Sequence, residues 1–178
     1  GAPQSVNGFY CSDNQLTTLE GAPQSVGGSF DCSYNQLTTL EGAPQSVGGE
    51  FDCSHNQLTS LEGVPQSVDG DFYCDNNQLS TLEGAPKSVD GDFYCDNNQL
   101  TTLEGAPQSV DDFICSDNKL FNLEFAPSCQ SIYCGNNPIS EWWSRVDDIS
   151  KLGAFIDLGI DSRDPDFMNQ EKIDLLLE

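Results

Sequence analysis

Cysteine has the most reactive side chain in this sequence, and it recurs at a nearly fixed interval. Cβ atoms one rung apart in a stack of parallel strands would lie about 4.8 Å from each other, whereas a disulfide needs about 3.8 Å. Metal-ligand spacing such as Cys-x-x-Cys is absent, and a Phe crowds each cysteine of the series. We therefore expect buried free thiols, with neither metal nor cofactor, at Cys11, Cys32, Cys53, Cys74, Cys95, Cys115 and Cys134.

The eighth cysteine, Cys129, falls outside this series, in the last loop, and is expected to be exposed. Eight thiols without a disulfide framework favour a reducing compartment, so we expect a cytoplasmic protein.

The remaining polar side chains do not make a catalytic set. The sequence has one histidine, His55, and no Ser–His–Asp arrangement, zinc-ligand spacing or phosphate-binding glycine loop, which predicts that the protein is not an enzyme. His55 has no partner of the kind that acid–base chemistry needs and is expected to decorate the surface. The acidic triplets 75–77 and 96–98 could suggest calcium, but their last Asn is needed at a turn and the glycine-rich calcium-repeat signature is missing.

A repeated sequence unit supplies the strand and turns that position the cysteines and the polar side chains. Within a unit, the alternation Phe-x-Cys predicts a short strand, the following Asn predicts a turn, and Gly and Pro predict an extended or 3₁₀-like return arm. A degenerate seventh unit begins at Phe125. The opening word Gly-Ala-Pro-Gln-Ser-Val, with small changes, occupies 1–6, 21–26, 42–47, 63–68, 84–89 and 105–110.

The unit resembles the leucine-rich repeat, L-x-x-L-x-L-x-x-N-x-L, with Val, Phe and Cys at the first three Leu positions. The resemblance implies a repeat solenoid over residues 1–139, a right-handed superhelix with a parallel β-sheet on one face. The wording Leu-Glu-Gly-Ala-Pro is similar to short repeats in proteins of bacteriophages, large DNA viruses and bacteria. That similarity implies a phage or viral protein in an infected host cell, with a virion as the alternative location. After residue 139 the pattern becomes helical, around Trp142 and Trp143, which predicts a short α-helical cap over 140–178.

Stacking turns each repeated residue into a column, because no single unit can bury its apolar face alone. Two columns predict the core: Phe9, Phe30, Phe51, Phe72, Phe93, Phe113 and Ile132, and Leu16, Leu37, Leu58, Leu79, Leu100, Leu120 and Ile139. A third column should hydrogen-bond the backbone of its own unit and of the next: Asn14, Asn35, Asn56, Asn77, Asn98, Asn118 and Asn137. A column of glutamates on the return arm predicts a solvated face: Glu20, Glu41, Glu62, Glu83, Glu104 and Glu124.

Charge restricts the partners. The 178 residues contain 29 Asp and Glu against 6 Lys and Arg, for a formal net charge of −23. That charge repels nucleic acid and anionic membranes and favours a basic partner. No apolar stretch of about 18 residues predicts a membrane span. The first unit shows no cap, so end-to-end self-association is expected at its apolar edge, although the shared charge opposes it.

Function is expected where otherwise matching units differ. Outward positions on and after the strands combine carboxylates with tyrosines, and tyrosine is enriched in binding surfaces. We therefore predict a protein–protein interaction module whose sheet face meets a basic protein surface. Two alternatives stay open: a nucleic-acid mimic that inhibits a DNA-binding enzyme, and a structural or virion component. The predicted partner-binding residues are Tyr10, Tyr34, Glu50, Asp52, Asp71, Tyr73, Asp75, Asp92, Tyr94 and Asp96.

Overall fold

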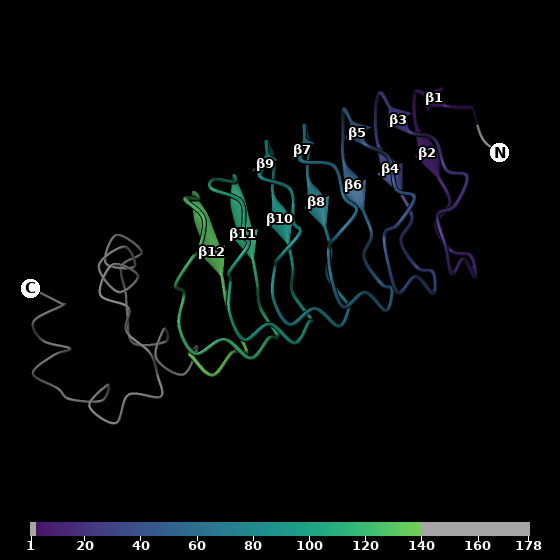
Figure 1. The fold of residues 1–178 in the computed structure, drawn as a ribbon. Coiled ribbons are helices and arrows are strands. Elements are labelled where there is room, and N and C mark those ends of the chain that lie inside the picture. The colour runs from purple at the N-terminus through teal and green to yellow at the C-terminus, as the bar shows by residue number, and fades with distance from the viewer. Residues whose placement is uncertain (1–2, 140–178) are drawn as a thin grey trace, which may run out of the picture.

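Each repeat of the chain forms one coil of a parallel β-solenoid. The computed structural model describes residues 3–139, and the α-helical cap predicted at 140–178 lies outside the described residues. Successive coils stack side by side along one axis, with the N-terminal coil at one end of the array (Figure 1). We number the coils by repeat, so that coil 1 is residues 3–20 and coil 7 begins at residue 125. The predicted repeat solenoid is confirmed.

Seven parallel strands, one per coil, form the larger sheet, and they lie next to one another in chain order. Their register pairs each Phe with the Phe of the neighbouring coil, so the repeated residues do form columns. The strands are β2 (Phe9–Tyr10), β4 (Phe30–Asp31), β6 (Phe51–Asp52), β8 (Phe72–Tyr73), β10 (Phe93–Tyr94), β11 (Asp112–Ile114) and β12 (Ser131–Tyr133).

A second parallel sheet of five strands runs beside the first, and the sequence reading had placed a sheet on one face only. Its strands are the Ser-Val pairs of the repeated word, and the Val side chain of each pair points into the core. They are β1 (Ser5–Val6), β3 (Ser25–Val26), β5 (Ser46–Val47), β7 (Ser67–Val68) and β9 (Ser88–Val89). An isolated parallel bridge between Ser109 and Ser128 continues the same pairing into coils 6 and 7.

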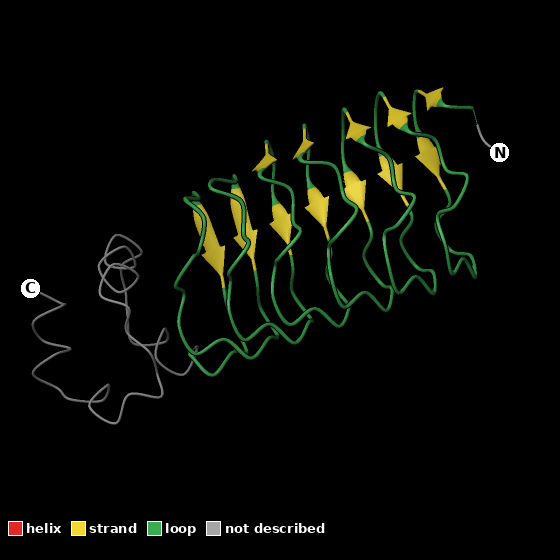
Figure 2. Cartoon of the chain, viewed as in Figure 1, coloured by secondary structure: helices red, strands yellow, loops and turns green. Residues whose placement is uncertain are grey.

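The return arms are not helical. Residues 3–139 contain neither α-helix nor 3₁₀-helix, so each arm runs through bends and turns between its inward leucines (Figure 2). The 3₁₀-like alternative for these arms is therefore wrong. Since a glycine with positive φ, such as Gly42, and a proline, such as Pro44, interrupt the arms, no helical hydrogen-bond series can form. None of the described residues belongs to a helix that could cross a membrane.

The core is a column of phenylalanine rings flanked by leucines, as predicted. Adjacent rings lie 5.1 to 5.7 Å apart between centroids and are stacked or tilted. The five rings from Phe30 to Phe113 are completely buried, whereas Phe9 and Ile132 at the two ends are half-buried. Each inner ring therefore packs between two neighbours in the stack, whereas among the described residues Phe9 and Ile132 each have a neighbour on one side only.

The cysteine column lies beside the rings, and its predicted burial is confirmed except at Cys11, which is half-buried. All eight thiols are free, and burial raises the pKa of Cys53 and Cys74 well above the ordinary value. The two thiols donate to backbone carbonyls of the following coil: Cys53 Sγ to Tyr73 O at 3.2 Å and Cys74 Sγ to Tyr94 O at 3.3 Å. Cys129 is half-buried against the core and not exposed as expected, because the Ser128 backbone of its loop is held in the second sheet.

Candidate functional site

In each coil, one residue after the strand of the larger sheet has the left-handed backbone conformation. These residues form a row across the coils and set the direction of the side chains that follow the strand. Their φ values lie between 51° and 54°. Asn, Asp and His are enriched in this conformation, whereas Tyr is uncommon there. Tyr34 was predicted as part of the sheet face but occupies this turn row. The turn row is Asp13, Tyr34, His55, Asn76, Asn97, Asp117 and Asn136.

The asparagine column holds these turns in place. Asn77 Nδ2 donates to Cys74 O and Asp75 O of its own coil and to Cys53 O of the coil before. Asn77 Oδ1 accepts from the backbone N–H of Leu58 at 2.9 Å. The predicted scaffold role is confirmed, with one correction. The second coil that each side chain bonds is the preceding one and not the next, because the turn faces back along the stack.

Two tyrosines of the larger sheet stack on its solvent side. The rings of Tyr73 and Tyr94 lie 4.5 Å apart between centroids with an interplanar angle of 11°. The Tyr73 hydroxyl donates to Asp71 Oδ2 at 3.0 Å, and the Tyr94 hydroxyl donates to Asp92 Oδ2 at 3.2 Å. Burial and the hydrogen bond to the carboxylate raise the pKa of both phenols. The pair is therefore a fixed, protonated aromatic surface.

The same aspartates also bond the backbone, a role that the sequence reading missed. Asp71 Oδ1 accepts from the N–H of Asp92 at 2.9 Å, and Asp92 Oδ1 accepts from the N–H of Asp112 at 3.0 Å. Each carboxylate thus links its own tyrosine to the next coil. The signal was present in the sequence, since Asp occupies this position in coils 4, 5 and 6, whereas the other coils have Gly8, Ser29, Glu50 and Ser131.

Two further carboxylates, those of Asp52 and Asp75, are half-buried on the same sheet face. Asp52 Oδ1 accepts from the N–H of Ser54 at 2.9 Å, and Asp75 Oδ2 accepts from Asn76 Nδ2 at 2.7 Å. Burial is the largest cause that raises the pKa of each carboxyl above the ordinary value of 3.8, and a neighbouring aspartate adds to it. Ionising these two groups therefore costs more in the folded coil than in the unfolded chain.

These shifts predict a pH dependence of stability. A carboxyl whose pKa is higher in the folded state contributes stability that is present below its unfolded pKa and is lost as the pH rises through the folded pKa. We expect the double substitution D52N/D75N to flatten the fall in unfolding free energy between about pH 4 and pH 7, because Asn keeps an acceptor oxygen without the charge. Urea denaturation followed by circular dichroism at several pH values measures this slope.

The matched control for that experiment is E62Q/E83Q, which removes two charges from exposed positions on the return arm. It should leave the slope nearly unchanged. Equal flattening by the two double substitutions would mean that total charge governs the slope and that burial of the Asp52 and Asp75 carboxyls does not.

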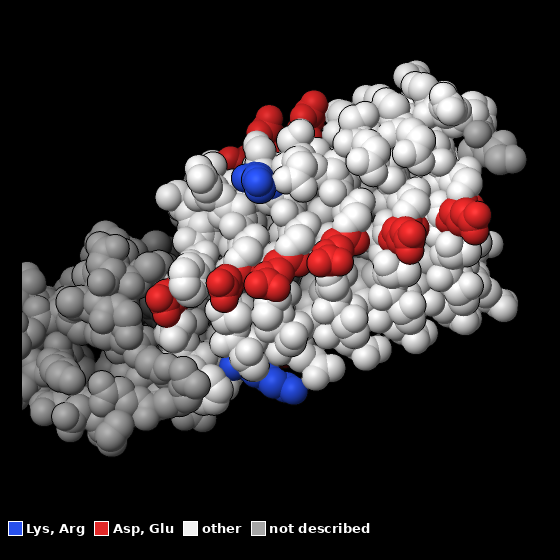
Figure 3. All heavy atoms as spheres, viewed as in Figure 1, with Lys and Arg blue, Asp and Glu red and all other residues white. Residues whose placement is uncertain are grey.

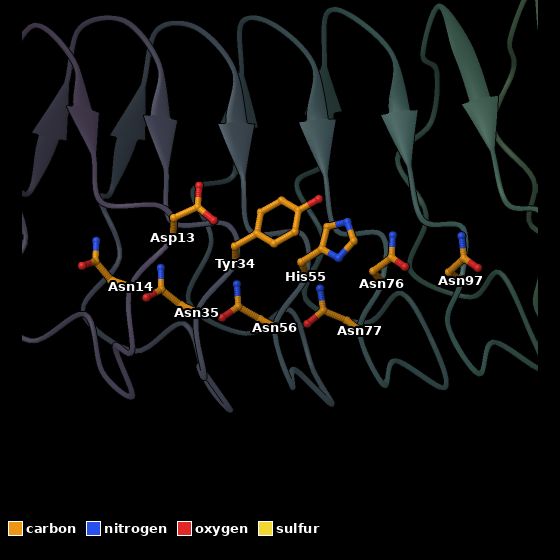
Figure 4. A pocket seen from close by; sticks show the side chains of 9 residues that line it. All are labelled: Asp13, Asn14, Tyr34, Asn35, His55, Asn56, Asn76, Asn77 and Asn97. Carbon is orange, nitrogen blue, oxygen red and sulfur yellow. The ribbon is translucent and has the colours of Figure 1, made fainter.

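His55 has two neighbouring side chains, Tyr34 and Asp75, that the sequence did not reveal. Its ring stacks on Tyr34 with centroids 4.0 Å apart and an interplanar angle of 12°, and its Nε2 lies 3.9 Å from Asp75 Oδ2. These contacts join coils 2, 3 and 4, and no single repeat reveals them. The turn row and the asparagine column border a shallow groove of about 760 Å³ (Figure 4). Asp13, Tyr34, His55, Asn76 and Asn97 follow one another along it (Figure 4).

Most of the predicted partner-binding residues come together on three consecutive coils. We call this surface the acidic face, and it lies on the solvent side of the larger sheet in coils 3 to 5. Of the other two predicted residues, Tyr10 is 70% exposed at the first coil and Tyr34 is 52% exposed in the turn row. The acidic face comprises Glu50, Asp52, Asp71, Tyr73, Asp75, Asp92, Tyr94 and Asp96.

Positive charge is scarce along the array. Of the six Lys and Arg residues of the chain, Lys87 and Lys119 fall within the described range, and neither is on a strand of the larger sheet. Acidic side chains also form a row that crosses the coils in the view of Figure 3. The described residues contain no group of three or more His, Cys, Asp or Glu side chains placed to hold a metal ion.

Fold and surface together define a class: a repeat protein with a parallel β-solenoid scaffold and coil-to-coil variation on one sheet face. Neither a protein-family model nor a curated protein sequence matches this chain.

Proposed function

We propose that this protein is a non-catalytic interaction module of the leucine-rich-repeat type, and that its acidic face binds a basic protein surface. One observation carries the proposal. Coils 3 to 5 place six carboxylates around a stacked pair of tyrosines on one side of one sheet, and coils 4 and 5 have the same residues there. Solenoid proteins commonly bind partners through such extended sheet surfaces.

The chemistry of the acidic face suits arginine and lysine. Glu50 is exposed, and Asp96 is half-buried with one oxygen held by Asn97, which leaves acceptor capacity toward solvent. The stacked rings of Tyr73 and Tyr94 offer an aromatic edge beside these carboxylates. Guanidinium groups can bond a carboxylate through two N–H groups and can stack on aromatic rings.

The leucine-rich-repeat assignment is supported by the asparagine column, whose amides bond two coils, and by the two inward Leu columns that follow the turns. Because the Leu-Glu-Gly-Ala-Pro repeat is similar to repeats in phage and viral proteins, we propose that this is a phage or viral protein. It would act on a basic host factor in a reducing cytoplasm. A right-handed superhelix belongs to the same proposal.

Charge reversal at the acidic face tests the proposal. We choose Glu50→Lys and Asp96→Lys, because Asp71 and Asp92 bond the next coil and their loss would disturb the fold. The double variant should weaken binding of a fluorescently labelled arginine-rich peptide by about tenfold at low salt, with little change in melting temperature. Fluorescence anisotropy measures the affinity, and added salt should reduce it further.

The control is the double variant Glu62→Lys and Glu83→Lys, which changes the net charge equally on the exposed return arm. It should weaken peptide binding by less than about twofold, because the acidic face is intact. The same loss in both variants would contradict a defined binding face and leave only general attraction by charge. If the unaltered protein instead displaces duplex DNA from a DNA-binding enzyme through the same residues, nucleic-acid mimicry replaces this proposal.

A further inference from the structure

The groove between the turn row and the asparagine column lies beside the acidic face, and none of the residues that line it belongs to that face. It crosses coils 1 to 5, which corresponds to a length of about 19 Å at about 4.8 Å per coil. What this groove can bind depends on which polar atoms along it are still able to bond a ligand.

The asparagine column supplies one side of the groove, and its polar atoms are engaged within the scaffold. Asn56 is buried; its Nδ2 donates to three backbone carbonyls, and its Oδ1 accepts from the N–H of Leu37. Asn35 and Asn77 make the corresponding bonds. These amides hold the backbone, so selection of a ligand falls to the turn row on the other side.

The turn row offers acceptor oxygens. Asn76 Nδ2 donates to Asp75 Oδ2 and Asn97 Nδ2 donates to Asp96 Oδ2, each at 2.7 Å. Both amide nitrogens point toward the strands, and both amide oxygens point away from them (Figure 4). Because each amide donates to a carboxylate, its oxygen becomes a stronger acceptor. Together with the exposed carboxylate of Asp13, the row therefore presents more acceptors than donors.

Tyr34 and His55 add an aromatic surface to this row. The Tyr34 side chain is 52% exposed, and its ring stacks on His55. Asp13 lies on the other side of Tyr34 (Figure 4). The turn itself does not require an aromatic ring, because Asp or Asn occupies the same left-handed position in five other coils. An aromatic ring next to a carboxylate attracts a cation and packs against methylene groups.

Charge selects the kind of ligand. The chain has a formal net charge of −23, which opposes an anion. Among residues 3–139 the Lys and Arg side chains are Lys87 and Lys119, and neither lines the groove. An ammonium group donates hydrogen bonds and accepts none, so it matches a row of acceptors. A saccharide hydroxyl both donates and accepts, and it matches such a row less well.

We propose that this groove binds a linear polyamine, such as spermine, laid along the axis of the array. Its methylene chain packs on Tyr34, and its ammonium groups bond the Asp13 carboxylate and the amide oxygens of Asn76 and Asn97. Successive nitrogens of such a chain lie about 5 Å apart, close to the coil spacing of about 4.8 Å, so they stay in step with the row. A lysine side chain brings a single ammonium group to the row, whereas a polyamine carries several along one chain.

The single histidine of the sequence, His55, reports directly on the groove. In the unaltered full chain, spermine should shift the NMR signals of the His55 ring until they saturate, at constant pH and about 0.15 M salt. Ethylamine at the same ionic strength should leave them nearly unchanged, because screening alone acts on all exposed charges. Absence of a saturable shift would overturn the proposal. A tighter effect of a lysine-rich peptide on the same signals would also overturn it, and would assign the groove to a protein segment.

A set of variants supplies the second measurement. Asp13→Asn and Tyr34→Asn introduce the turn-row residue of coils 4 and 5, so the left-handed turn is retained. Isothermal titration calorimetry should show spermine binding weakened about fivefold by D13N and at least about tenfold by the double variant.

The matched control is Asp117→Asn, which removes the same charge from the turn row in coil 6, outside the groove. It should weaken spermine binding by less than about twofold. Equal losses in D13N and D117N would show that spermine follows the total charge, and the proposed site would then be wrong. Asp13, Tyr34 and Asp117 lie outside the acidic face, so that result would not affect the partner-binding proposal.

Discussion

Gly105→Ala is expected to lower the free energy of unfolding by about 3–5 kcal/mol, because an alanine there meets both a torsional and a steric penalty. Gly105 has φ +93°, a conformation that costs an L-residue about 1–2 kcal/mol. A Cβ atom at this position would lie 2.5 Å from the carbonyl carbon and oxygen of Leu82, in the return arm stacked against it. Backbone atoms cannot swing aside as a flexible side chain can, so the coils must separate locally.

Gly21→Ala is expected to carry the torsional penalty without the steric one, so comparing it with Gly105→Ala separates the two. Gly21 has a similar φ of +87°, but no earlier return arm lies against it among the described residues. Only the torsional cost of about 1–2 kcal/mol is expected there. Phe125 stands at the equivalent position in the array with φ +66°, so a side chain can adopt this conformation. Equal losses in urea denaturation of G105A and G21A would show that close packing between coils contributes nothing.

The repeat period allowed the core to be predicted residue by residue. Once coils stack in register, a residue such as Phe51 or Leu58 must face the same way as its counterparts, and both are completely buried. The same reasoning located the asparagine amides and the free thiols. These predictions depend only on the side chain's place in the repeat, which is why a single sequence was sufficient.

Features that depend on short elements or on neighbouring coils were beyond that reasoning. A two-residue strand such as Ser46–Val47 shows no alternation long enough to recognise, so the second sheet was not predicted. The stacking of Tyr34 on His55 and the approach of Asp75 require the actual rotamers of three coils. A carboxylate such as Asp71 can face solvent or accept a hydrogen bond from the next coil. The choice depends on side-chain geometry, which the residue types at the repeated position do not give.

Asn77→Ala is expected to have an equally large effect on stability, since it removes four hydrogen bonds from a buried turn. The amide nitrogen loses its bonds to Cys53 O, Cys74 O and Asp75 O, and the N–H of Leu58 loses its acceptor. Asn77 is 8% exposed, so water does not easily replace these partners. Each buried polar group left unsatisfied costs about 1–3 kcal/mol, which predicts a loss of about 4 kcal/mol for the variant. Urea denaturation of N77A and the unaltered chain measures it.

Asn14→Ala is the matched control because Asn14 occupies the same position of the repeat without a preceding coil among the described residues. It makes only two side-chain hydrogen bonds, both within its own coil, and is exposed to water. Its loss should cost about 1 kcal/mol or less. If N14A and N77A destabilise the chain equally, the asparagine stabilises only its own turn. A difference of about 3 kcal/mol would instead assign most of its contribution to the joining of adjacent coils, on which the register of the acidic face depends.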